Sequence, residues 1–214
     1  MGNCRLGVLV SGRGTNLQAI IDAVQDRRLP VEIAVVVSNH AGVLALSRAE
    51  AAGIPTVVLE RRSFASRDEQ QQAIRDALLA RRVDLVVLAG FDRVVGPDLL
   101  AAFPHRIINI HPSLLPAFGG GLHAQADALA YGAKVSGCTV HFVTNQVDGG
   151  PIIVQRAVPV LDDDTVESLS ARILEQEHEA LIEAIGLFAD GRLRIEGRRV
   201  FTTPSPKAQQ RADH

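Results

Sequence analysis

The chain has 214 residues, of which 47% are hydrophobic and 21% are charged, enough to bury one substantial hydrophobic core. Lys and Arg number 22 against 24 for Asp and Glu, so the net charge of -2 provides no basic excess for binding nucleic-acid phosphates. The longest mostly apolar run, residues 83–91, is too short to cross the roughly 30 Å of a bilayer core. We therefore expect one soluble domain, with neither nucleic acid nor a membrane as its partner.

The ends of the chain and its cysteines and histidines narrow the class of protein further. Residues 1–5 contain no apolar signal core, which predicts a cytoplasmic protein. The two cysteines, Cys4 and Cys138, cannot build a disulfide framework, and the histidines lack the spacing of a metal site. We expect no metal. From about residue 202 onward, prolines and polar residues predict a flexible tail over 202–214.

In the first half of the chain, short runs rich in Val, Ile and Leu alternate with segments of helical period. Continuous apolarity predicts strands that are buried on both faces. Alternation of such strands with helices predicts a parallel sheet with right-handed crossovers. We expect strands at about 5–10, 31–37, 56–59, 83–89 and 106–110, and helices at about 15–28, 42–53 and 67–82.

The second half has a different pattern. Residues 136–143 alternate between apolar and polar side chains, and 152–160 form another extended run, so both are candidates for an antiparallel pair at a sheet edge. A long helix is predicted from about 165 to 189, with Asp164 as its cap and an end near Gly191. The predicted fold is α/β: a Rossmann-like, mostly parallel twisted sheet with helices on both faces, in a single domain.

A glycine-containing loop follows the first predicted strand and leads into a helix. In Ser11–Asn16, with the sequence SGRGTN, backbone N–H groups at the helix start are suited to receive a phosphate. Leu17 occupies the third glycine position of a dinucleotide loop, Ser38 and Asn39 stand where a ribose-binding carboxylate is expected, and the Gly-Lys-Ser/Thr of an NTPase is missing. The loop therefore predicts a monophosphate site; the alternative is an ordinary tight turn.

Two further loops leave the same predicted edge of the sheet, residues 90–95 and 109–113. Asn109 and His111 are two residues apart on a strand, so both side chains point the same way. A catalytic histidine needs a carboxylate partner, and Asp148, in the glycine-containing loop 144–151, is the best candidate. The alternatives are that Asn109 and His111 satisfy turn backbone, and that Asp148 belongs to a simple Asp-Gly turn.

Glu177 falls in the middle of the apolar stripe of the last predicted helix. A carboxylate at such a position is partly buried, which is costly without a partner. It is expected either to pair with a basic residue, for example near the phosphate loop, or to bind hydroxyl or amine groups of a ligand.

Taken together, these motifs resemble those of the phosphoribosylglycinamide formyltransferase family. The resemblance runs from about Leu6 to Val200 and is carried by Ser11–Asn16, Ala89-Gly90-Phe91, Arg93, Asn109–Pro116, 137–143, Val147–Gly150 and Gln176-Glu177-His178. It implies the formyltransferase fold over 1–201, with a ribonucleotide half at about 1–100 and a folate and catalytic half at about 101–201. It also implies transfer of a formyl group from the cosubstrate 10-formyltetrahydrofolate to the amine of glycinamide ribonucleotide, in purine biosynthesis.

The resemblance assigns roles residue by residue. Asn109 and protonated His111 stabilise the oxyanion, His111 protonates the leaving folate nitrogen, and Asp148 favours the imidazolium and orders a water that takes the amine proton. The ribonucleotide would be held by Gly14, Thr15, Asn16 and Glu177. The folate would be surrounded by Arg67, Asp92, Arg93, Val94, Val95, Asn109, Thr144, Asn145, Gln146, Val147 and Asp148.

The sequence departs from the family pattern in two places, and two other functions remain open. Asp92 stands where the family usually has Met, and one extra residue within 117–125 leaves His123 or Gln125 as the match to a family histidine. The first alternative function keeps the three catalytic residues but hydrolyses formyltetrahydrofolate, or formylates methionyl-tRNA or a sugar amine. The second is a nucleotide-binding module without catalysis.

Overall fold

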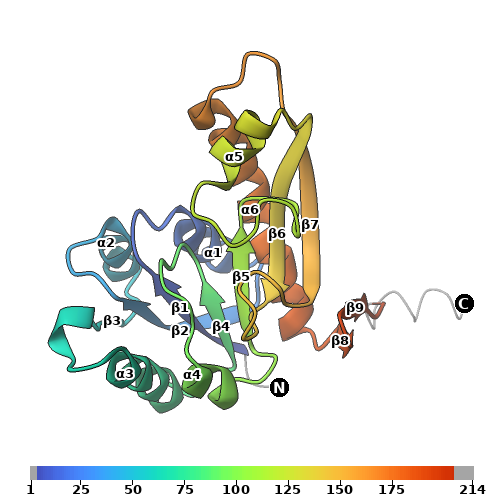
Figure 1. The fold of residues 1–214 in the computed structure, drawn as a ribbon. Helices are drawn as coiled ribbons and strands as arrows, with labels where there is room; N and C mark the ends of the chain where they lie inside the picture. Colours follow the sequence, from blue (N-terminus) through green and yellow to red (C-terminus); the bar gives the residue numbers. More distant parts are fainter. Residues whose placement is uncertain (1–3, 205–214) are drawn as a thin grey trace, which may run out of the picture.

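The computed structural model describes residues 4–204, and its elements surround one seven-stranded sheet of order β3-β2-β1-β4-β5-β6-β7 (Figure 1). In chain order the elements are β1 (Cys4–Val10), α1 (Thr15–Gln25), β2 (Val31–Ser38), α2 (Leu44–Ala51), β3 (Thr56–Val58), a 3-10 turn (Arg61–Ser63), α3 (Arg67–Ala80), β4 (Leu85–Leu88), α4 (Pro97–Ala102), β5 (Ile107–His111), α5 (Ala124–Tyr131), β6 (Val135–Phe142), β7 (Ile152–Pro159), α6 (Val166–Ala189), β8 (Leu193–Glu196) and β9 (Arg199–Thr202).

The sheet is parallel from β3 through β5 and antiparallel at β6 and β7. Residues 6–10 of β1 and all of β4 are buried on both faces, as their continuous apolar sequence predicts. Helices α1, α2 and α6 pack on one face, and α3 and α4 pack on the other. The predicted Rossmann-like, mostly parallel fold is confirmed, including the antiparallel pair at one edge.

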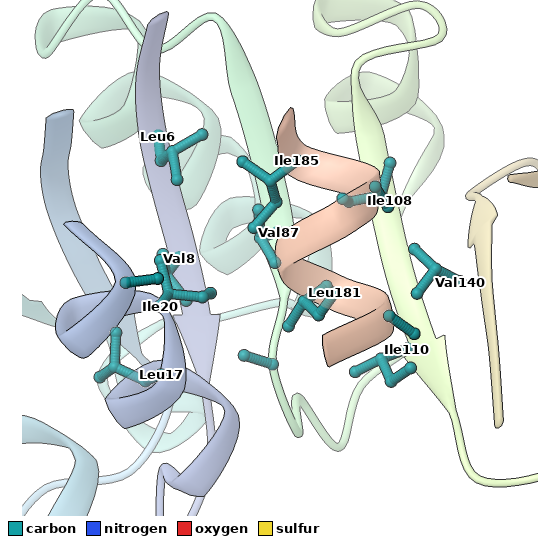
Figure 2. Close-up of a cluster of buried hydrophobic side chains, with 14 of the residues drawn as sticks. Leu6, Val8, Leu17, Ile20, Val87, Ile108, Ile110, Val140, Leu181 and Ile185 are labelled. Carbon is teal, nitrogen blue, oxygen red and sulfur yellow. The ribbon is translucent and has the colours of Figure 1, made fainter. Parts of the chain in front are cut away.

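The larger hydrophobic core lies between the sheet and helices α1 and α6 (Figure 2). Leu17 and Ile20 on α1 face Val8 of β1, while Leu181 and Ile185 on α6 face the central strands. All five side chains are completely excluded from solvent. Each contributes about 1.5–3 kcal/mol to folding relative to an exposed position, so this layer holds the strand ends in place beneath the loops.

The strand order places a crevice at a defined point of the sheet. After β1, the chain adds β2 and then β3 on one side of it, and then crosses over to add β4 on the other side. The order of strands therefore reverses between β1 and β4. In open α/β sheets, ligands bind at the carboxyl ends of the strands beside such a reversal. Residues 11–16 follow β1 and residues 90–95 follow β4, so these two loops flank the crevice.

The start of α6 differs from the predicted arrangement. The cap is Thr165, whose side chain accepts the Ser168 N–H, while the Ser168 hydroxyl receives the Thr165 N–H in return. Asp164 was predicted as the cap, and that prediction is wrong. Its carboxylate instead accepts hydrogen bonds from Nη1 and Nη2 of Arg172, at 2.7 and 2.8 Å, and from the Leu161 N–H at 2.8 Å.

Helix α4 and the hairpin of β8 and β9 were not predicted. Pro97 occupies the first position of α4, where its missing N–H costs nothing. Thr202, assigned above to a flexible tail, belongs to β9, and Thr203 N–H donates to the Arg192 carbonyl at 2.9 Å. The rest of that predicted tail, 205–214, lies outside the described residues. Within 4–204, no helix is long and apolar enough to cross a membrane.

Candidate active site

A cleft of about 570 Å³ opens at the carboxyl ends of β4 and β5. Three loops and the neighbouring strand β6 form its walls. The lining residues are Leu88, 90–95, 109–112, 120–122, His141, Val143, Thr144 and 146–148. Segments that are separated by up to about sixty residues in the sequence therefore meet in one concave surface, as the convergence of the loops predicts.

Strand β5 supplies Asn109 and His111 to the cleft. Because they are two residues apart on one strand, both side chains face the same side of the sheet and both line the cleft. The His111 imidazole is buried, with Nδ1 3.5 Å from Oδ2 of Asp148 and Nε2 3.1 Å from the carbonyl oxygen of Phe118. Each ring nitrogen thus faces an acceptor, an arrangement that the doubly protonated imidazolium satisfies best.

Asp148 reaches this position from the loop between β6 and β7. Its backbone adopts φ 50°, and the N–H of Gly120 donates to Oδ2 at 2.8 Å. The imidazole of His141 contributes most to lowering the pKa of Asp148; the Gly120 N–H and the charge of His111 act in the same direction, and burial opposes them. The carboxylate is consequently ionised across the neutral pH range, as a partner of an imidazolium must be.

The loop that carries Asp148 is held by a close backbone approach. A Cβ atom on Gly150 would lie 1.7 Å from the carbonyl oxygen of Phe142, so only glycine fits. The Phe142 N–H donates to the carbonyl of Pro151 at 2.9 Å, which ties the end of β6 to the start of β7. The glycines of residues 144–151 therefore let this loop fold back on its own strand.

His141 was not predicted as part of the site. It is the register partner of Asn109 across β5 and β6, and its Nε2 lies 3.3 Å from Nδ2 of Asn109 and 3.6 Å from Oδ1 of Asp148. Its Nδ1 lies 2.9 Å from the carbonyl oxygen of Phe142. The alternation over 136–143 placed His141 on the face opposite Cys138, but the register of the strands, which brings it to Asn109, is not visible in the sequence.

The Ser11–Asn16 loop forms a second site at the start of α1. Gly14 has φ 72°, and a Cβ there would lie 2.6 Å from Cβ of Ala45. The absence of a side chain at this position therefore lets α2 pack closely against the loop. Nδ2 of Asn16 donates to Oε2 of Glu177 at 2.9 Å, while Oδ1 of Asn16 is buried without a hydrogen-bond partner in residues 4–204. Gly14, Asn16 and Glu177 are thus brought together.

The partner of Glu177 is the Asn16 amide, so of the two alternatives left open by the sequence, the structure does not support pairing with a basic residue. Glu177 is only 8% exposed, and burial raises the pKa of its carboxyl group, with the hydrogen bond from Asn16 opposing the effect. The Glu177 carboxylate and the buried Oδ1 of Asn16 place two acceptors close together. The exposed part of the carboxylate suits a ligand that brings hydroxyl or amine donors.

The family described as Formyl transferase matches residues 4–185. The chain belongs to this family.

Formyl transferases close to this chain are known both as sequences and as structures. Phosphoribosylglycinamide formyltransferase of Haemophilus influenzae is 43% identical, over 92% of this chain and 92% of that protein. Glycinamide ribonucleotide transformylase 1 of Symbiobacterium toebii is 54% identical in sequence, with a TM-score of 0.93 over 94% of this chain and 95% of that chain. The trifunctional purine biosynthetic protein adenosine-3 of Drosophila melanogaster is 48% identical over 87% of this chain, which spans 14% of that protein's length.

Most of the residues that the formyl transferase resemblance assigned to a folate line the cleft, but two do not. Asn145 is exposed at the tip of its loop and takes no part in the cleft wall. Arg67, at the start of α3, lines an adjoining hollow of about 250 Å³, where its Nη2 donates to the carbonyl of Val94 at 2.7 Å. His123 precedes the first residue of α5, and Gln125 lies in that helix's first turn.

Proposed function

We propose that this chain transfers a formyl group from 10-formyltetrahydrofolate to the amine of glycinamide ribonucleotide, giving the formylated ribonucleotide and tetrahydrofolate in purine biosynthesis. The observation that carries the proposal is the meeting of Asn109, His111 and Asp148 in the cleft at the carboxyl edge of the sheet. The names of the Haemophilus influenzae and Symbiobacterium toebii proteins support the choice of acceptor.

The start of α1 supports the ribonucleotide part of the proposal. The N–H groups of Thr15 and Asn16 lie in the first turn of α1, which Gly14 precedes as the N-cap; there the helix dipole favours an anion such as the ribonucleotide phosphate. The Glu177 carboxylate offers an acceptor for ribose hydroxyl groups. A ligand with one phosphate and several hydroxyl groups matches both features.

The cleft supports the folate part. Its walls combine apolar side chains, among them Leu88, Phe91 and Val143, with backbone groups of the 90–95 and 144–148 loops. Sites for flat heterocyclic ligands are typically apolar clefts with a few convergent polar groups. We assign Asp92, Arg93, Val94, Val95, Thr144, Gln146, Val147 and Asp148 to the folate side, and place Arg67 and Asn145 at its periphery.

The chemistry follows from the three catalytic residues. The acceptor amine forms a C–N bond to the formyl carbon, and the carbonyl electrons move to oxygen, giving a tetrahedral oxyanion. The Asn109 amide and the His111 imidazolium stabilise this oxyanion. The C–N bond to the folate then breaks as His111 gives its proton to the departing nitrogen, while the amine proton passes to a water ordered by Asp148. Before it can act, the imidazolium must release one of its two present acceptors, the carbonyl of Phe118 or Asp148.

Competing acceptors test the proposal. The purified protein is mixed with 10-formyltetrahydrofolate and one acceptor at a time: glycinamide ribonucleotide, methionyl-tRNA, a nucleotide-linked amino sugar, or none. We expect deformylated folate to form rapidly only with glycinamide ribonucleotide. Equal rates with another acceptor would refute the assignment of the substrate, and no reaction with any of them would support the non-catalytic alternative.

A further inference from the structure

Asp92 lies in a hydrogen-bonded network between three loops. Ser11 follows β1, Asn39 and His40 follow β2, and Asp92 follows β4. The three strands are neighbours in the sheet, in the order β2-β1-β4, so their carboxyl ends lie side by side. The Asp92 side chain is 41% exposed and borders the cleft.

Three hydrogen bonds close a ring among these loops. The Asp92 N–H donates to Oγ of Ser11 at 3.0 Å, the Ser11 hydroxyl donates to Oδ1 of Asn39 at 2.6 Å, and Nδ2 of Asn39 donates to Oδ1 of Asp92 at 2.7 Å. Removing the Ser11 or Asn39 side chain breaks two bonds of the ring, and removing the Asp92 side chain leaves the Asn39 amide without its acceptor. Asn39 is only 4% exposed, which makes an unpaired amide at this point costly.

The network is anchored to the sheet on both sides. Oδ2 of Asp92 lies 2.9 Å from Nε2 of His40, whose backbone N–H and carbonyl both bond the hydroxyl of the buried Ser38 at the end of β2. In addition, Ser11 N–H donates to the Gly90 carbonyl at 3.0 Å. The two loops are thus joined to each other, and to the ends of β1, β2 and β4, by direct hydrogen bonds.

From this network we propose that Asp92 is a positioning residue, which sets the spacing between the ribonucleotide loop (11–16) and the folate-side loop (90–95). The inference rests on the proposed function, in which the acceptor amine and the formyl carbon are held by those two loops. Attack requires the reacting atoms to be aligned at about 3–3.5 Å, and a misplacement of about 1 Å can cost roughly 100-fold in rate. A methionine at 92 could not form the ring through its side chain, because a thioether is at best a weak acceptor.

The test separates the rate of transfer from the binding of each ligand. Asp92→Ala breaks the ring at the Asn39 amide, whereas Asp92→Asn keeps an oxygen for that amide and can offer its own N–H to neutral His40. At saturating concentrations of both substrates, we expect D92A to lower the single-turnover transfer rate by about tenfold or more, while the Kd of the ribonucleotide alone changes less than about threefold. D92N should restore the rate to within about threefold of wild type.

Asp164→Asn provides the matched control, because Asp164 is equally rich in hydrogen bonds but lies at the start of α6, away from both loops. It should reduce thermal stability without changing the transfer rate. If D92A does not fold, Asn39→Ala breaks two bonds of the same ring and should show the same loss of rate.

Three results would overturn the inference: a D92A rate equal to wild type, a loss confined to the Kd of the folate, or an equal loss of rate in D164N. Inactive wild-type protein would instead refute the proposed function, so the two failures are distinguishable.

Discussion

Oδ2 of Asp148 lies 3.5 Å from Nδ1 of His111, with both side chains almost excluded from solvent, at 13% and 8% exposed. The pair links β5 to the loop that follows β6, and these two strands are antiparallel neighbours. A carboxylate at such burial is costly unless other groups satisfy it, and the Gly120 N–H does so at 2.8 Å. The glycine-rich segment 119–121 thus contributes directly to the site.

His111→Ala tests the acid in the proposed mechanism. Loss of one positioned acid typically costs about 10² to 10⁴ in rate, so we expect turnover to fall by that factor while both ligands still bind. Steady-state kinetics and calorimetric titration measure the two effects. His105→Asn is the matched control, since His105 is exposed and asparagine tolerates its φ of 54°. A folded H111A protein with near-normal turnover would rule out His111 as the acid.

Glu177→Gln should raise stability but weaken ribonucleotide binding. Burial raises the folded-state pKa of Glu177, so its contribution to stability is complete below the unfolded pKa of about 4.3 and is lost as pH rises through the folded pKa. Glutamine keeps an acceptor for the Asn16 amide without the buried charge. Denaturation at pH 4 and pH 7 should show E177Q gaining stability over wild type only at the higher pH, and ribonucleotide affinity should fall. Unchanged affinity would remove Glu177 from the binding site.

Gly14→Ala tests how far the phosphate loop depends on packing. A Cβ at position 14 would meet Ala45 and would be strained at φ 72°, so we expect the free energy of unfolding to fall by about 1 kcal/mol or more. Gly12→Ala is the control, because nothing lies within 4 Å of a Cβ there. Chemical denaturation compares the two variants. Equal stabilities would contradict the packing role of Gly14.

Gly150→Ala and Gly149→Ala form a matched pair in the loop that carries Asp148. The added Cβ would lie 1.7 Å from the Phe142 carbonyl oxygen at position 150, but would meet only the flexible side chain of Gln146 at position 149. We expect G150A to displace Asp148 and reduce both turnover and thermal stability strongly, and G149A to remain close to wild type. Similar behaviour of the two variants would show that the backbone approach at Gly150 does not hold Asp148.

The parts of the fold that sequence predicted are those in which one physical signal dominates. The continuous apolar run over residues 33–37 is buried on both faces, and the alternating run 136–143 forms β6, which pairs with the edge strand β7. The β8 and β9 hairpin was missed because its strands are only four residues each and lie outside the main sheet. None of their side chains is fully buried, so the sequence has no run of apolar residues there. The cap of α6 was misplaced because Asp164 and Thr165 are both good capping residues.

The site was only partly visible in the sequence for a different reason. Asn109 and His111 share a strand, so their common direction follows from local geometry. Asp148 could be proposed as the partner of His111 only from chemistry, and His141 could not be recognised, since its place opposite Asn109 depends on strand register. The network around Asp92 likewise depends on which strands are neighbours, which the sequence does not state.

The fate of the formyl carbon tests the central proposal most directly. 10-Formyltetrahydrofolate labelled with ¹³C at that carbon is mixed with the protein, with and without glycinamide ribonucleotide, and followed by NMR. We expect the label to appear in the amide of the formylated ribonucleotide, at a rate that depends on the acceptor and that falls sharply in H111A. Label released as formate at the same rate with or without the acceptor would contradict the account and identify a hydrolase.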